Sequence, residues 1–254
     1  MRQFGLIGFP LSHSFSKGFF TKKFSELKMM DIEYENFPIE AMSSFSDLWS
    51  SHPELEGINI TIPHKKAVIP FLQHSSLVVQ EIQACNCIRK YKGQLYGYNT
   101  DVIGFEKSLL PFLKPQHTHA LILGTGGAAV AVEWVFKKLK IEYKFVTRNS
   151  KAGNAAAKFI SYEDLTNDVI SKYTLIVNTS PVGMSPHVTQ SPAIPYEAIT
   201  DKHHLYDLIY NPGETVFLQK GKAQGATIQN GLEMLHLQAE ASWEIWNAET
   251  PLIQ

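Results

Sequence analysis

The feature that most constrains this chain is a glycine-rich turn that joins an apolar run to a segment of helical length. Residues 120–123 (ALIL) are apolar, residues 124–127 read GTGG, and residues 128–140 form an amphipathic stretch. Glycines in such a turn let the backbone approach a pyrophosphate, and the helix N-terminus adds positive potential. The spacing is shorter than the full GxGxxG fingerprint, so a tight strand–helix connection without a nucleotide is the alternative. The turn predicts at least one parallel α/β unit.

The rest of the chain repeats this alternation of short apolar runs and helix-length segments, which is typical of βαβ units. Residues 85–98 predict a hairpin that turns at Lys92-Gly93. The expected strands are 4–9, 32–37, 57–62, 143–146, 175–177, 205–208 and 227–229, and the further helices are 15–27 and 231–247. We therefore expect an α/β fold of two domains, with a boundary near Asp101.

Composition excludes several classes of protein. Lys and Arg number 23 against 24 Asp and Glu, so no overall field would hold the chain on nucleic acid or on an anionic membrane. The only cysteines, Cys85 and Cys87, are expected to be small strand residues, and no metal site is expected. No segment has the ~20 apolar residues that span a bilayer, and the chain is expected to be cytoplasmic.

Arg148 follows the second expected strand of the glycine-loop unit. A site for NAD places Asp or Glu at this point to bind the ribose hydroxyls, whereas Arg suits the 2′-phosphate of NADP. Lys151 would add charge nearby. Taken alone, Arg148 is equally well explained as a solvated cation at a strand end.

Three polar motifs precede the glycine loop: SHS (12–14), NITIPHK (59–65) and NTD (99–101). Paired hydroxyls after a strand can bind a carboxylate, although Ser14 could instead cap a helix. Lys65 and Asp101 each follow a strand, and open α/β sheets place ligands at that edge. The alternative for both is an ordinary solvated surface charge.

Motifs along nearly the whole chain resemble, in order, those of the shikimate dehydrogenase family. They are residues 8–14, 59–65, 86, 97–101, 124–129, 178–184, 206–212 and 231–239. The resemblance implies a substrate domain of residues 1–101 with 232–254, its C-terminal helix returning to it. It also implies a Rossmann-like NADP domain of residues 102–231.

The resemblance also implies roles for individual residues. Lys65 would exchange a proton with the substrate oxygen, and Asp101 would orient it. An adjacent carboxylate favours the charged form of a lysine. The implied substrate ligands are Ser12, Ser14, Thr61, Asn86, Tyr210 and Gln238. The implied NADP ligands are Gly124, Gly126, Gly127, Ala128, Thr147, Arg148, Lys151, Thr179, Met184, Leu208 and Gly231.

The chain departs from the family pattern at two places. Lys17 stands where the family usually has proline, and residues 147–149 read TRN in place of NRT. Two alternatives stay open: a quinate/shikimate dehydrogenase that uses NAD or both cofactors, and a sensor that binds shikimate and NADP without turnover. The expected partners are small molecules, and the protein is expected to be a monomer or a homodimer.

Overall fold

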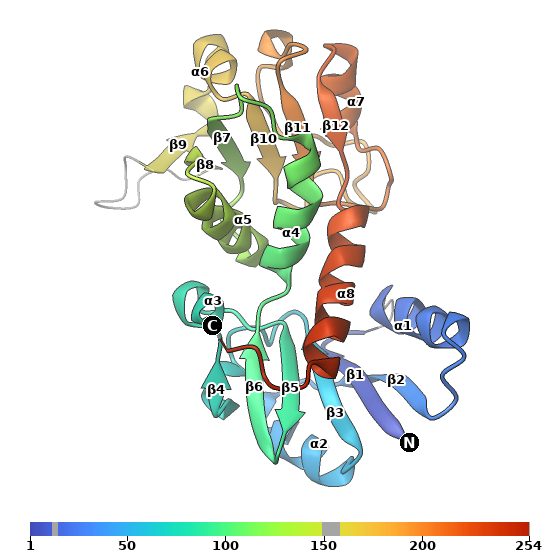
Figure 1. The fold of residues 1–254 in the computed structure, drawn as a ribbon. Coiled ribbons are helices and arrows are strands. Elements are labelled where there is room, and N and C mark those ends of the chain that lie inside the picture. Colours follow the sequence, from blue (N-terminus) through green and yellow to red (C-terminus); the bar gives the residue numbers. More distant parts are fainter. Residues whose placement is uncertain (12–14, 149–157, 254) are drawn as a thin grey trace. The chain divides into compact units, whose positions relative to one another are not determined.

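The computed structural model describes residues 1–11, 15–148 and 158–253, which form two compact units (Figure 1). The first unit contains Met1–Ile103 and Gln238–Gln254, and the second contains Gly104–Leu237. Both limits fall inside helices, namely α4 (Asp101–Leu109) and α8 (Leu232–Asn247). The sequence shows no linker because the chain passes from one unit to the other within a continuous helix each time.

The first unit is built on one six-stranded mixed sheet with the strand order β2-β1-β3-β5-β6-β4. Its strands are β1 (Arg2–Gly8), β2 (Ile32–Pro38), β3 (Leu55–Ile60), β4 (His74–Ser75), β5 (Cys87–Tyr91) and β6 (Gln94–Tyr98). Its helices are α1 (Phe15–Glu26), η1 (Met42–Ser44), α2 (Phe45–Ser51), η2 (Ile69–Phe71) and α3 (Leu77–Ile82). β1, β2 and β3 are parallel, and β5 is antiparallel to β3 and β6.

The expected hairpin is confirmed as β5 and β6. Lys92 and Gly93 have φ of 49° and 77°, so both turn residues are left-handed, as a two-residue hairpin loop requires. Cys85 and Cys87 are free and fully buried, and burial raises the pKa of the Cys85 thiol to about 12. Both behave as small hydrophobic residues.

The end of α8 packs on the first sheet, as expected for the C-terminal helix. The Trp246 ring stacks on Phe4 with centroids 4.8 Å apart, and its Nε1 donates to the Ile88 carbonyl at 2.9 Å. A Cβ at Gly57 would clash with the Trp246 indole, so this glycine lets the helix approach β3 closely. Strand alternation puts Ile7, Ile58 and Ile88 in a separate cluster from Phe4, so the sheet is covered on both faces.

The second unit is a parallel sheet with the order β12-β11-β10-β7-β8-β9. Its strands are β7 (His119–Leu123), β8 (Glu142–Thr147), β9 (Phe159–Ser161), β10 (Leu175–Asn178), β11 (His204–Asp207) and β12 (Thr227–Gln229). The further helices are η3 (Leu110–Phe112), α5 (Gly127–Lys138), η5 (Tyr162–Asp164), α6 (Asn167–Lys172), η6 (Tyr196–Ala198) and α7 (Val216–Ala223). The chain runs outward from the centre in both directions, which is the Rossmann-like order.

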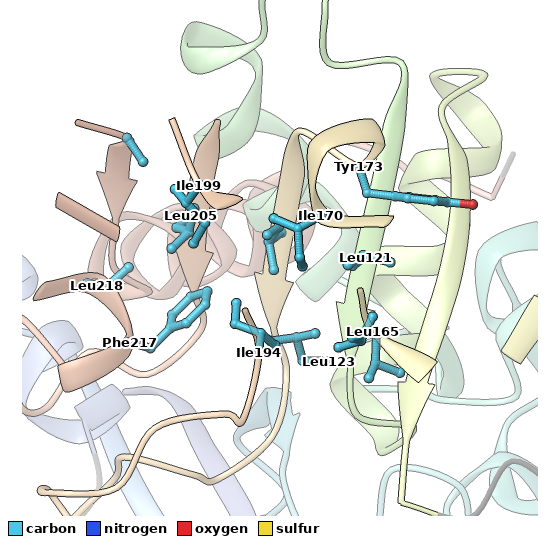
Figure 2. Packing of buried hydrophobic residues seen from close by; sticks show 13 residues of the cluster. Leu121, Leu123, Leu165, Ile170, Tyr173, Ile194, Ile199, Leu205, Phe217 and Leu218 are labelled. Carbon is cyan, nitrogen blue, oxygen red and sulfur yellow. The ribbon is translucent and has the colours of Figure 1, made fainter. Parts of the chain in front are cut away.

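Helices cover both faces of this sheet. Leu121 and Leu205 belong to a cluster with Phe217 of α7, which Figure 2 shows together with Ile170 of α6. On the other face, Tyr206 stacks on Phe105 of α4 at 5.3 Å. The central strands β7 and β10 are therefore buried on both sides, which explains why they read as continuous apolar runs rather than as alternating ones.

Some elements differ from the expectation. The strand expected over residues 57–62 is β3, which ends at Ile60; Ile62 is 74% exposed, in a turn closed by the His64 N–H on the Thr61 carbonyl. The expectation also lacked β4, β9 and every described helix of nine residues or fewer, α4 and α7 included, because short elements carry little periodicity. No helix in the described part of the chain has the length and apolar character to cross a membrane.

Candidate active site

A lysine–carboxylate pair lies at the carboxyl edge of the first sheet. Lys65 Nζ is 2.6 Å from Asp101 Oδ2, and the Asn86 amide donates to Asp101 Oδ1 at 2.8 Å. The side chains of Lys65 and Asp101 are 32% and 18% exposed. A charge pair that is partly buried yet open to solvent can exchange a proton with a ligand while its orientation is maintained.

The NTD motif positions this pair through the start of α4. The Asn99 side-chain oxygen accepts the N–H groups of Asp101 and Val102 at 3.0 and 3.3 Å, while its amide donates to the Ala84 carbonyl. Asn99 therefore caps the helix and ties its start to the segment before β5. Asp101, as the first helical residue, projects from a fixed backbone.

Thr100 connects the pair to α8. The Thr100 N–H donates to Asn86 Oδ1 at 2.6 Å, and its hydroxyl lies 3.3 Å from Ser242 Oγ and 3.4 Å from Gln238 Oε1. Ser242 also accepts from the Asn59 amide at 2.9 Å. The first-unit polar cluster thus joins four segments that are far apart in the sequence, at residues 59, 86, 100 and 238–242.

The predicted substrate ligands are placed as follows. Asn86 and Gln238 lie in this cluster, and Thr61 is the residue after β3, its N–H bonded to the Ile7 carbonyl. Tyr210 belongs to the second unit and is 43% exposed. Ser12 and Ser14 lie outside the described residues. Thr100 belongs to the NTD motif but was given no role, and Ser242 was missed; the position of Ser242 one helical turn after Gln238 was the available signal.

The family departure at Lys17 has a local structural partner. Lys17, in the first turn of α1, forms a 2.6 Å ion pair with Glu35 of β2. The lysine therefore links helix and strand at the position where the family usually has proline.

The second unit has a cleft of about 560 Å³ at its switch point between the parallel strands β7 and β10. The chain continues from β7 to β8 on one side of this point and from β10 to β11 on the other. It is lined by Gly124, Thr125, Gly126, Val146, Thr147, Arg148, Tyr162, Thr179, Ser180, Pro181, Val182, Ser191, Pro192 and Ala193. Open α/β sheets bind their ligands at this position.

The glycine loop needs its glycines for different reasons. Gly124 has φ of 110°, a left-handed conformation that disfavours a side chain. Gly126 is the cap of α5 and has no side chain to occupy the N–H groups of the first turn, where Gly127 and Ala128 lie exposed. This leaves a helix N-terminus of positive potential open to an anion.

Of the other predicted cofactor ligands, Thr147, Arg148 and Thr179 line the cleft, whereas Met184, Leu208 and Gly231 do not. Lys151 lies outside the described residues. Tyr162 and the segment 191–193 were missed, because nothing in their sequence marks a ligand site. Burial raises the pKa of Tyr162, and the positive charge of Arg148 opposes this rise.

Leu208 and Gly231 instead form the backbone next to the segment that follows β10. The Leu208 N–H donates to the Asn178 carbonyl at 3.0 Å, and the Gly231 N–H donates to the Ile209 carbonyl at 3.1 Å. A Cβ at Gly231 would clash with the Leu208 carbonyl, so only glycine fits there. The Met184 N–H donates to the Pro181 carbonyl at 3.1 Å and closes a turn after β10.

The two units together define a class: an α/β protein with a Rossmann-like unit, whose glycine loop can accept a dinucleotide, and a second α/β unit with a lysine–carboxylate pair. Comparison with known proteins narrows this class. The sequence model of the shikimate dehydrogenase substrate binding domain matches residues 6–88.

Relatives match over nearly the full length. Shikimate dehydrogenase (NADP(+)) of Desulforamulus reducens is 34% identical, covering 97% of this chain and 90% of that protein. Thermus thermophilus shikimate 5-dehydrogenase in complex with NADP(H) and shikimate has a TM-score of 0.85 at 29% identity, covering 99% of this chain and 95% of that one. Gluconobacter 5-ketofructose reductase has a TM-score of 0.86 at 26% identity, covering 98% and 94%. The chain belongs to the shikimate dehydrogenase family.

Proposed function

We propose that this protein is a shikimate dehydrogenase that reversibly reduces 3-dehydroshikimate to shikimate with NADPH, a step of aromatic amino acid biosynthesis. The observation that carries the proposal is the Lys65–Asp101 pair at 2.6 Å, in a chain 34% identical to a named NADP-dependent shikimate dehydrogenase. The pair supplies the proton donor that this reaction needs and that the nicotinamide cofactor does not provide.

Reduction of a ketone requires a hydride at carbon and a proton at oxygen. When bound, NADPH supplies the hydride only. In the proposed mechanism Lys65 Nζ donates the proton to the ketone oxygen and takes it back in the oxidation. Asp101 orients the ammonium and accepts a hydrogen bond from the neighbouring hydroxyl of the ring, while Asn86 holds the other oxygen of Asp101.

Binding of the substrate ring is assigned to Ser12, Ser14, Thr61, Asn86, Tyr210 and Gln238. The two serines would hold the carboxylate. Thr61, Asn86 and Gln238 would bind the ring hydroxyls, and Tyr210 would also reach the substrate. Support comes from the shared polar cluster of Asn86 and Gln238 around Thr100.

The cleft residues fit a dinucleotide phosphorylated on the ribose. Gly124 and Gly126 leave the backbone accessible at the start of α5, and Arg148 is exposed at the end of β8. We assign the pyrophosphate to residues 124–128, the 2′-phosphate to Thr147, Arg148 and Lys151, and the nicotinamide side to Thr179, Met184, Leu208 and Gly231. Support for the 2′-phosphate assignment is the planar guanidinium, which binds phosphate with two parallel hydrogen bonds.

The experiment that tests this function follows absorbance at the reduced-nicotinamide band while the purified protein oxidises shikimate with NADP. Parallel reactions contain quinate, or NAD in place of NADP, and the reverse direction is run with 5-ketofructose and NADPH because of the Gluconobacter relative. Turnover restricted to shikimate and NADP is the expected result. Comparable turnover with quinate or NAD would assign the broader enzyme, and ligand binding without turnover would indicate a sensor.

We also infer a cytoplasmic location and a monomeric or homodimeric state. Support for the location is the pair of buried, free cysteines, which are usual in a reducing compartment. Light scattering after size-exclusion chromatography would measure the oligomeric state.

A further inference from the structure

Asp207 is a buried carboxylate at the end of β11 that the proposed chemistry does not use. Its side chain is fully buried, and burial raises the pKa of this carboxyl to about 6. A carboxylate in such a place destabilises the fold unless hydrogen bonds compensate for the lost water. Packing alone does not explain why a carboxylate, rather than an apolar side chain, is buried here.

Three donors from three segments converge on this carboxylate. The Thr215 hydroxyl, at the N-cap of α7, donates to Oδ2 at 2.6 Å. The Asn178 amide, at the end of β10, and the Ile209 N–H, just after β11, donate to Oδ1 at 3.0 and 3.1 Å. Asp207 thus connects the end of β10 and the segment after β11 to the start of α7.

The bond from Asn178 to Asp207 fixes which way the Asn178 amide points. Because its nitrogen faces Asp207, its oxygen faces Ser180 and accepts both the N–H and the hydroxyl of that residue, at 3.1 and 2.7 Å. The amide nitrogen also donates to the Val182 carbonyl at 3.3 Å. All hydrogen-bonding positions of the Asn178 amide are then occupied.

The residues held in this way belong to the cleft. Thr179, Ser180, Pro181 and Val182, here called the cleft loop together with Gly183, form part of the wall of the 560 Å³ cavity. Gly183 adopts a φ of 99°, so the loop ends in a conformation that favours glycine. The Asn178 amide holds the middle of the loop at Ser180 and Val182, while Thr179 is tied separately to the Leu123 carbonyl.

We propose that Asp207 is a positioning residue that, through Asn178, holds the cleft loop in the shape that receives the dinucleotide. The inference rests on the proposed function, because NADP is the ligand that reports the shape of the loop. It assigns Asp207 no contact with substrate or cofactor.

Four variants separate positioning from plain stability. Asp207→Ala removes the acceptor, and Thr215→Val keeps the carboxylate but removes its shortest hydrogen bond. Asp207→Asn keeps Oδ1 as the acceptor for Asn178 and replaces Oδ2 by an NH2 group. The Thr215 hydroxyl can accept a hydrogen bond from this group. Thr166→Ala is the matched control, since Thr166 caps α6 in the same unit by a bond to the Val169 N–H and does not line the cleft.

The experiment measures the Kd of NADP+ by calorimetry, the Tm, and kcat and KM for shikimate in each variant. Asp207→Ala should raise the Kd of NADP+ about tenfold or more, the loss expected for an unmade buried hydrogen bond, and Thr215→Val about threefold to tenfold. Asp207→Asn and Thr166→Ala should stay within about threefold of the wild type, and KM for shikimate within about twofold in all four.

An equal Kd of NADP+ in Asp207→Ala and Thr166→Ala would overturn the inference, as would a Kd that follows the Tm through the whole series. If Asp207→Ala does not fold, the Kd of NADP+ is compared between Thr215→Val and Thr166→Ala, and equal values would again overturn the inference. A wild type that binds NADP+ without oxidising shikimate would refute the proposed function alone, because the Kd series still tests Asp207. A wild type that binds neither NADP+ nor NADPH would overturn both.

Discussion

Replacing Lys65 by methionine removes the ammonium group while keeping a side chain of similar length. In the first unit this leaves Asp101 with the Asn86 amide as a donor and with an 18% exposed side chain that water can reach. The loss in the free energy of unfolding should therefore stay at about 1–2 kcal/mol. A general acid or base contributes about 10² to 10⁴ in rate, and kcat should fall by that factor.

The assay is shikimate oxidation at saturating NADP, with the Tm of each protein recorded by circular dichroism. The expected Tm shift is small, about 2–4 °C for each kcal/mol in a chain of this size. Lys66→Met is the matched control, because Lys66 is the next residue and is exposed. A Lys65→Met protein with kcat within about threefold of the wild type would refute the proton-transfer role.

Three further predictions concern the second unit. Arg148→Gln should raise KM for NADP by about 10- to 100-fold, the value of a charge-assisted phosphate contact, and leave kcat/KM with NAD unchanged; equal effects on both cofactors would contradict the assignment. Gly231→Ala should lower the free energy of unfolding by about 1–3 kcal/mol in a urea titration, because its Cβ clashes with a backbone carbonyl. Gly213→Ala is its control, since the nearest atom to that Cβ is 3.9 Å away. Burial lowers the pKa of His204 to about 4 and raises that of Asp207 to about 6. The histidine's contribution to stability is present above pH 6.5 and lost as the pH falls to 4, whereas the aspartate's is present below pH 3.8 and lost as the pH rises through 6. His204→Gln should therefore gain about 2 kcal/mol relative to the wild type between pH 7 and pH 4.5 in urea titrations, and a constant difference would contradict the buried neutral state.

Part of the candidate site could be predicted from local patterns. Gly124 and Gly126 follow an apolar run and precede a helix, so the loop they form depends on adjacent residues only. Arg148 was predicted at the end of the next strand, and it lines the same cleft. The pairing of Lys65 with Asp101 came from the family resemblance, because the spacing of two charges 36 residues apart does not define a contact.

Other parts of the site had no signal in the sequence. Tyr162 follows a strand of three residues and resembles any aromatic residue beside a turn. Asp207 reads as an ordinary strand-end carboxylate, and only its burial and its three donors reveal the constraint. Such properties belong to the surroundings of a residue and not to its place in a motif.

By itself the sequence determined the α/β class, the hairpin at Lys92-Gly93 and the strand–glycine loop–helix unit. These features follow from the periodicity of apolar residues and from backbone conformations that glycine permits, which act within a few residues. Only the tertiary structure decided that Thr100 contacts Gln238, 138 residues away, and that Asn178 faces Asp207. Contacts of this kind depend on strand order and helix packing, and these are settled by the burial of whole faces rather than by any local pattern.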